Sequence, residues 1–76
     1  MKEILEILIK SLVENADEVV ITEKQEEKET LYEVKVAQTD MGKVIGKQGR
    51  IAKSIRTVMK SVAGKEHKKV TIEFLN

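Results

Sequence analysis

Residues 41–60, MGKVIGKQGRIAKSIRTVMK, carry six of the fourteen Lys and Arg residues of this 76-residue chain and no Asp or Glu. They also hold three of its four glycines, and two of these, Gly46 and Gly49, enclose only Lys47 and Gln48. Glycine lets a backbone reverse through positive φ angles and leaves room for another backbone to approach closely. The segment therefore predicts a glycine turn that leads into a basic helix.

The residues after this turn repeat with helical spacing. One arc of the helical wheel is apolar and contains Ile51, Ile55, Val58, Met59 and Val62. A second arc is basic and contains Arg50, Lys53, Arg56 and Lys60. This pattern predicts an amphipathic helix over residues 50–63, with Gly64 as its C-cap. Before the turn, Thr39 or Asp40 is a suitable N-cap for a short helix that ends near residue 45.

The flanking segments supply one more helix and three strands. Residues 2–15 place Ile4, Leu5, Leu8, Ile9, Leu12 and Val13 on one helical face, with Ile7 outside it and Asn15 as the terminator. Strands are predicted around the β-branched core 19–21, over 31–37 and over 70–76, with a charged loop at 24–30. The order α-β-β-α-α-β predicts one α+β domain over residues 1–76, a three-stranded sheet covered on one face by three helices.

Charge divides between the halves of the chain. Residues 1–38 contain five lysines and ten acidic residues, whereas residues 39–76 contain nine basic and three acidic residues. Phosphate affinity depends on the local field, so the second half is a candidate polyanion-binding surface. The chain has no cysteine, no apolar run long enough to cross a bilayer and no signal peptide, which favours a reducing cytoplasm and excludes thiolate metal sites.

Three features that attract phosphate meet at the glycine turn. The two glycines give access to the backbone, the following helix offers the N–H groups and positive dipole of its N-terminus, and Lys47 and Arg50 add mobile charge. Lys53 and Arg56 extend this charge along the helix. The sequence therefore predicts that a nucleic-acid backbone binds at this turn.

The stretch VIGKQGRIAKSI (residues 44–55) resembles the signature of KH domains, an apolar pair, GxxG and then apolar positions along a helix. The element order is similar to that of the type II, prokaryotic KH fold. The resemblance covers the whole chain and extends to the small bacterial RNA-binding members that consist of one KH domain. It implies a cytoplasmic RNA binder or RNA chaperone without a cofactor, which forms a homodimer or pairs with a second KH protein of the KhpB (Jag) type. It also implies effects on cell shape and cell wall biogenesis.

The resemblance assigns site residues by position. It implies that about four nucleotides of single-stranded RNA are clamped by Gly46, Lys47, Gln48 and Gly49. Charge would come from Lys43, Arg50, Lys53 and Arg56, and apolar contact from Ile45 and Ile55, with Ala52 as a shallow floor. Val36 and Ala37 would lie near the opposite wall. Glu26, Glu27 and Glu29 would repel phosphates, so contact is expected mainly on the glycine side.

Other readings remain open or fail on particular residues. There are two alternatives. The first is a protein-interaction module that uses the same surface, or the Ile7 edge, as a dimer interface. The second is a helix-turn-helix that binds double-stranded DNA.

A Walker A loop fails because GKVIGKQ has one residue too few between its glycines and has Gln48 in place of Ser or Thr. A stacking platform is disfavoured because the only aromatic residues, Tyr32 and Phe74, alternate with core positions. His67 and the serines lack catalytic partners, and no metal-ligand spacing is present, so we expect no enzyme and no metal site.

Overall fold

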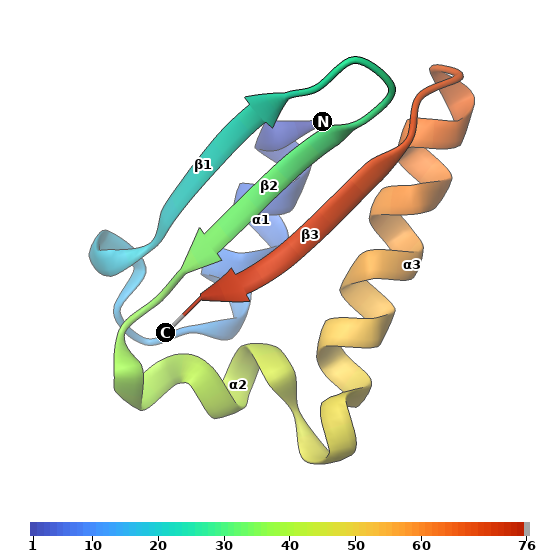
Figure 1. Ribbon diagram of the computed structural model, residues 1–76. Helices are drawn as coiled ribbons and strands as arrows, with labels where there is room; N and C mark the ends of the chain where they lie inside the picture. The colour runs from blue at the N-terminus through green and yellow to red at the C-terminus, as the bar shows by residue number, and fades with distance from the viewer. Residues whose placement is uncertain (76) are drawn as a thin grey trace.

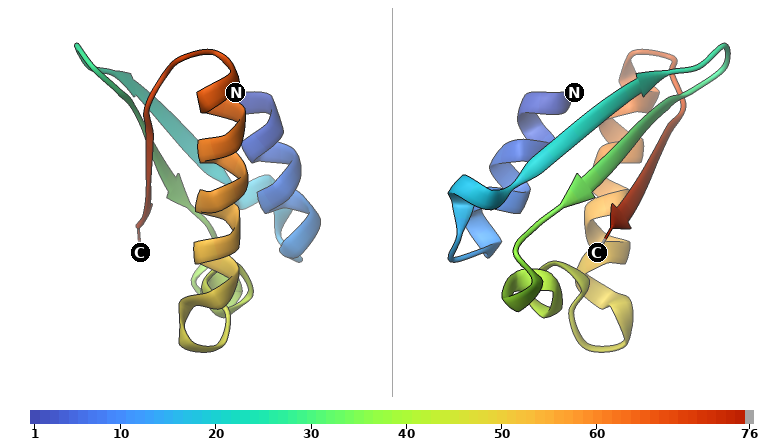
Figure 2. Two further views of the ribbon diagram at one scale, coloured as in Figure 1. Left: turned by 90° about the vertical axis from the view of Figure 1, so that its right-hand side faces the viewer. Right: turned by 60° about the vertical axis from the view of Figure 1, so that its left-hand side comes forward.

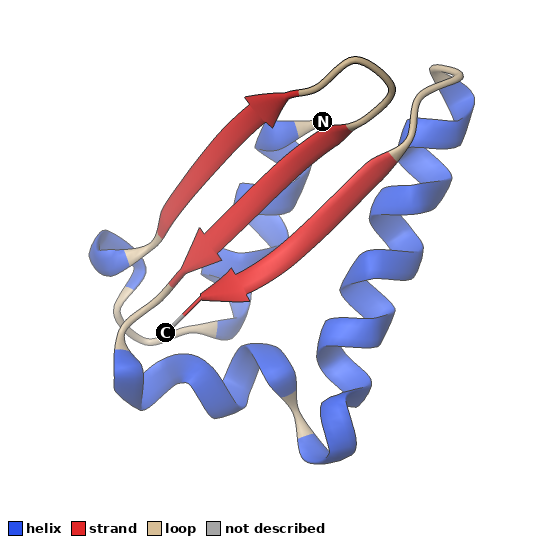
Figure 3. Cartoon of the chain, viewed as in Figure 1, coloured by secondary structure: helices blue, strands red, loops and turns tan. Residues whose placement is uncertain are grey.

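A computed structural model describes residues 1–75 and arranges them in the order α-β-β-α-α-β, which confirms the predicted α+β fold (Figure 1). The helices and strands are α1 (Lys2–Leu12), β1 (Val20–Gln25), β2 (Thr30–Lys35), α2 (Met41–Ile45), α3 (Arg50–Lys65) and β3 (Val70–Leu75). Single 3₁₀ turns, η1 (Ala16–Glu18), η2 (Gln38–Asp40) and η3 (Lys47–Gly49), lie between them. Figure 3 shows that loops are short throughout. The predicted third strand included Asn76, which lies outside the described residues.

The sheet is mixed, with strand order β1-β2-β3. β1 pairs antiparallel with β2, whereas β2 pairs parallel with β3, so that Tyr32 lies opposite Ile72. A parallel pair needs a long crossover connection, and here α2 and α3 form it. The turn between these two helices, which contains the glycines, therefore lies beyond the end of the sheet (Figure 1).

Helices α1 and α3 cover one face of the sheet and leave the other face open (Figure 2). Strand side chains alternate between the two faces, so Tyr32, Val34 and Ile72 point into the core. Tyr32 is only 1% exposed, which confirms that it is a core residue and cannot stack on a base. From the helices, α1 contributes Leu5 and Ile9, and α3 contributes Ala52, Ile55, Met59 and Ala63.

Two predicted boundaries are wrong for identifiable reasons. α1 ends at Leu12 rather than residue 15, because the backbone N–H groups of Glu14 and Asn15 donate to the Asp40 carboxylate instead of continuing the helix. α3 continues through Gly64 to Lys65. The residue in the left-handed conformation beyond its end is His67, with φ +56°, and the N–H of Lys68 donates to the Ala63 carbonyl at 2.9 Å as in a Schellman motif.

Two residues of the predicted apolar patterns are exposed. Val20, in the β-branched stretch 19–21, is 54% exposed because only every second strand residue faces the helices. Val58, on the apolar arc of α3, is 44% exposed. The arc is rotated towards the small residues Ala52 and Ala63, which are buried against the core.

Candidate nucleic-acid interface

The glycine loop, residues Gly46–Gly49, is held in an unusual backbone conformation. Gly46 has φ +76° and ψ 174°, Gln48 has φ +57°, and Gly49 has φ +74°. L-residues other than glycine rarely adopt positive φ. Three such angles within four residues turn the chain sharply from α2 into α3 and leave the loop projecting at one end of the molecule (Figure 1).

The two glycines of this loop have different surroundings. A Cβ on Gly46 would lie 2.6 Å from Cγ1 of Ile51, so this glycine is required by packing inside the protein. A Cβ on Gly49 would meet no heavy atom within 4 Å, so the space above it is open. Gly46 therefore serves the fold, while Gly49 leaves the loop surface free for an approaching ligand.

Backbone N–H groups of the glycine loop fall into two sets. The N–H of Gly46 donates to the Gly42 carbonyl at 2.8 Å, and that of Gly49 donates to the Gly46 carbonyl at 3.1 Å. The N–H groups of Lys47 and Gln48 open the 3₁₀ turn η3, and the first N–H groups of a helix have no partner within it. Both residues are exposed, so these donors lie just before α3, where the helix dipole is positive.

Basic side chains continue from the loop along α3. Arg50, Lys53, Arg56 and Lys60, here called the basic stripe, are all exposed. They are spaced three or four residues apart, so they lie above one another on one helix face. Arg50, Lys53 and Lys60 form no ion pair with another described residue, so their charge is available to an anion.

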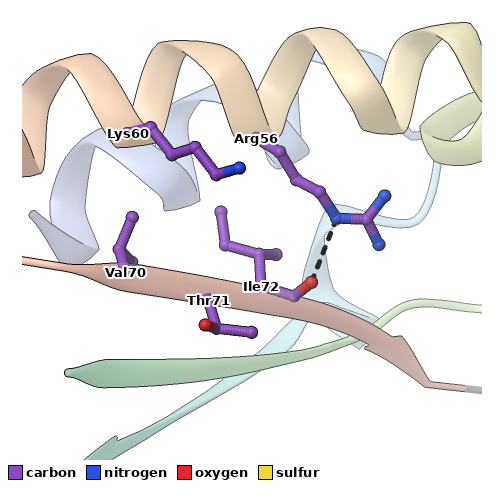
Figure 4. A pocket seen from close by; sticks show the side chains of 5 residues that line it. All are labelled: Arg56, Lys60, Val70, Thr71 and Ile72. Atoms are coloured by element: carbon purple, nitrogen blue, oxygen red, sulfur yellow. Dashed lines mark hydrogen bonds between the residues drawn. The ribbon is translucent and has the colours of Figure 1, made fainter.

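Arg56 links the basic stripe to the outer strand of the sheet. Its Nε donates to the Ile72 carbonyl at 3.2 Å, and its guanidinium lies 5.2 Å from the centre of the Phe74 ring. Beside it, α3 and β3 enclose a cleft of about 140 Å³ lined by Arg56, Lys60, Val70, Thr71 and Ile72 (Figure 4). Arg56 is thus held against β3 by a hydrogen bond from Nε and by the Phe74 ring.

Lys43, predicted to supply charge to RNA, is engaged within the protein. Its ammonium lies 2.8 Å from the Glu14 carboxylate and 3.4 Å from that of Asp40. The contact with Glu14 raises the pKa of Lys43. Its positive charge is therefore balanced locally, which makes it the weakest of the predicted cationic contacts.

Asp40 is the anchor of this ion pair and is itself 1% exposed. Burial would raise its pKa, but hydrogen bonds from the Asn15 and Glu14 backbone, the Asn15 side chain and Lys43 together hold the pKa of Asp40 below its usual value. Although it precedes α2, its side chain does not cap that helix. Instead it ties the segment after α1 to the start of α2, which leads into the glycine loop.

The predicted apolar contacts fall mostly inside the core. Ile55 is 4% exposed and Ala52 is 2% exposed, so both offer little surface to a ligand, and Ile55 does so only in the apolar groove between α1 and α3. Ile45 is half-buried and packs against the core from α2. Val36 and Ala37 line a separate hollow of about 400 Å³ with Glu18, Lys35 and Gln38, away from the glycine loop. The accessible interface is therefore mainly backbone and cations.

Four of the five residues that line the α3–β3 cleft lie outside the predicted site. Val70, Thr71 and Ile72 have no sequence signal, because the cleft exists only once β3 lies beside α3. Lys60 does have one, since it belongs to the basic arc of the helix. Within residues 1–75, no group of His, Asp and Glu could hold a metal ion, and no helix is long and apolar enough to cross a membrane.

Comparisons with known proteins agree with this geometry. A KhpA/KhpB KH-domain family model matches residues 2–74. The RNA-binding protein KhpA of Clostridium acetobutylicum is 56% identical over 75 residues, which cover 99% of this chain and 100% of the relative. KhpA of Clostridium perfringens is 55% identical with the same coverage, and KhpA of Aquifex aeolicus is 44% identical over 99% of this chain and 95% of its own length. The similarity thus extends from α1 to β3.

Proposed function

Because the chain belongs to the KhpA/KhpB family of KH domains, we propose that it is an RNA-binding protein that holds the backbone of single-stranded RNA at its glycine loop. Its relatives are named as RNA-binding proteins, and KH domains are binding modules rather than enzymes. We extend the proposal to residues 1–76 as a single KH domain that acts in the cytoplasm.

The observation that carries this proposal is the exposed turn at Lys47 and Gln48, whose N–H groups open η3 beside the open space above Gly49. An RNA phosphate can accept from these donors at the positive end of α3. The basic stripe then lies along the path of the strand, and no acidic residue occurs in residues 41–60. With backbone contacts dominating over base contacts, binding is expected to tolerate many sequences.

Salt dependence gives a quantitative expectation. Lys47 and the three cations of the stripe that carry no internal contact, Arg50, Lys53 and Lys60, make about four phosphate contacts. For single strands, log affinity falls against log salt with a slope of about −0.7 for each contact, which gives about −3 here. A flat response would contradict a backbone-binding mode.

The experiment is a Lys47→Asp/Gln48→Asp variant, which keeps both glycines. Gln48 has a positive φ, and Asp tolerates that conformation, so the loop can keep its shape. We expect RNA binding to collapse while the far-UV spectrum and melting temperature hold. A matched control, Lys35→Asp/Gln38→Asp, makes the same change of charge at two exposed residues that line the other hollow. Equal loss in both variants would refute the glycine loop as the binding site.

An exposed apolar surface favours a second role in protein association. Ile7 is 69% exposed, and Val58 lies in an apolar groove of about 300 Å³ between α1 and α3 that also contains Leu8, Leu12 and Ile51. We propose that this surface pairs with a second copy or with a KH protein of the KhpB (Jag) type. Ile7→Ser and Val58→Ser should then weaken association in sedimentation experiments. If these variants lose RNA binding while Lys47→Asp/Gln48→Asp retains it, the interaction role is primary.

The cellular role is proposed from the family alone. We propose that the protein acts as an RNA chaperone or post-transcriptional regulator with effects on cell shape and cell wall biogenesis. Crosslinking in cells, with identification of both the RNA and the protein recovered, tests this role. A preference for duplex DNA over single-stranded RNA in a direct binding comparison would instead support the DNA-binding alternative.

A further inference from the structure

The geometry points to a second phosphate-binding subsite at the far end of α3. We propose that a bound RNA strand continues beyond the glycine loop and the α3–β3 cleft and ends on Lys60, Lys68 and Lys69, here called the lysine pocket. This inference rests on the proposed function, and it extends the footprint past the roughly four nucleotides that a KH loop clamps.

The lysine pocket and the cleft adjoin each other. The pocket has a volume of about 290 Å³ and is lined by Glu29, Lys60, Lys68, Lys69, Val70 and Thr71. The cleft beside Arg56 shares Lys60, Val70 and Thr71 with it. Two neighbouring hollows with basic side chains therefore follow α3 and β3 from Arg56 to the loop that joins them.

The path from the glycine loop along these hollows is longer than a four-nucleotide site. From Arg50 to Lys60, ten helical residues rise about 15 Å at 1.5 Å per residue. A stacked strand places a phosphate about every 3.4 Å along its axis, so four nucleotides are used up before Lys60 is passed. An RNA strand that begins at the glycine loop can therefore reach Lys68 and Lys69 only if it is longer than four nucleotides.

The backbone that carries Lys68 and Lys69 is well anchored. His67 turns the chain through a positive φ, and the N–H of Lys68 donates to the Ala63 carbonyl at 2.9 Å. The Lys69 carbonyl accepts from the Thr30 N–H at 3.0 Å, which joins this loop to the start of β2. Both side chains are exposed and form no ion pair with another described residue.

The loop between β1 and β2, residues 26–29 and here called the acidic loop, lies beside the lysine pocket. Of its acids only Glu29 lines that pocket, against three lysines. Glu26 and Glu27 line a neighbouring hollow of about 210 Å³ whose wall also includes Lys68 and Lys69. The lysine pocket itself has a net positive charge, so a phosphate can bind there in addition to the main contact expected on the glycine side.

The test compares oligouridines of 4 and 12 nucleotides on the full chain and on a Lys68→Gln/Lys69→Gln variant. A control variant, Lys2→Gln/Lys35→Gln, removes the same charge from residues that line neither the cleft nor the lysine pocket. Because a longer homopolymer offers more binding registers to every variant, the measured quantity is the ratio of wild-type to variant affinity at each length.

We expect this ratio to stay within about twofold for the 4-mer. For the 12-mer at 0.1 M salt it should reach about 25-fold, because each of the two lost contacts contributes about 0.7 log units of affinity per tenfold dilution of salt. The salt slope for the 12-mer should become shallower by about 1.4. The same ratio at both lengths, or the same ratio in the control variant, would overturn the second subsite. Binding of the 4-mer by wild type would in that case still support the glycine loop. If wild type binds neither oligonucleotide, the proposed function falls and this inference with it.

Discussion

Gly46→Ala and Gly49→Ala should differ sharply, although the sequence presents the two glycines as equivalent. Gly46 lies at φ +76° and ψ 174°, a region that only glycine occupies readily, and forcing another residue there costs about 1–3 kcal/mol. A methyl group would also lie 2.6 Å from Cγ1 of Ile51, and overpacking of this kind costs about 1–3 kcal/mol more. The expected loss is therefore about 2–6 kcal/mol, a large share of the stability of a small domain.

Gly49→Ala should be far milder. Its φ of +74° and ψ of 14° fall in the left-handed helical region, where alanine costs about 1–2 kcal/mol, and its Cβ would meet open space. For a domain of this size, that corresponds to a fall in melting temperature of about 4–16 °C. The new methyl group would occupy the open space above the loop, where the RNA backbone is proposed to lie, so RNA affinity should fall in a protein that remains folded.

Urea and thermal unfolding of the two variants, followed by RNA binding of the folded one, measure this difference. An Ile51→Ala background provides the control, because removing Cγ1 and Cδ1 takes away the closest contact. Gly46→Ala should then cost at least about 1 kcal/mol less than in the parent chain, a coupling in the range found for residues in contact. Equal destabilisation by both glycine substitutions, or no coupling to Ile51, would refute the assignment of different roles.

Three further predictions concern the loops and the buried carboxylate. Gly64→Ala and His67→Gly should each raise the free energy of unfolding by about 0.5–1 kcal/mol in urea titrations, since Gly64 is helical with open space around it and His67 has a positive φ. Gln48→Asn should raise the melting temperature by a few degrees, because Asn adopts its left-handed conformation more readily. Asp40 has a pKa held below its ordinary value of 3.8, so its carboxylate stabilises the fold above that pH and the stabilisation is lost as pH falls through the folded pKa. Asp40→Asn should therefore lower the unfolding midpoint at pH 7, and the midpoint of the variant should fall less steeply than that of wild type as the pH is lowered. An equally steep fall in both proteins would contradict this.

Much of the fold could be predicted because its elements follow local patterns. Alternation in β2 and β3 and the helical spacing in α1 and α3 are properties of neighbouring residues, and they were sufficient for the order α-β-β-α-α-β. The errors lie where distant residues compete with local preference. Asp40 draws the N–H groups of Glu14 and Asn15 out of α1 from 26 and 25 residues away, respectively, which no local pattern reveals.

The candidate site likewise contains some residues that local sequence patterns reveal and others whose role depends on packing. The glycine loop and the basic stripe could be found from spacing and charge alone, and the structure exposes both. The balancing of Lys43 by Glu14 and the burial of Ile55 depend on how α1, α2 and α3 pack, so they had to be seen in three dimensions. The lysine pocket likewise exists only because the parallel pairing of β2 and β3 brings the loop after α3 beside the start of β2.

The most direct test of the central claim is an amide-resolved NMR titration of the protein with a short oligouridine at low salt. Binding at the glycine loop predicts that the largest shifts occur at the N–H groups of Lys47 and Gln48 and in the first turn of α3, with little change on the open face of the sheet. Shifts that cluster around Ile7 on α1, with the loop amides unmoved, would contradict it.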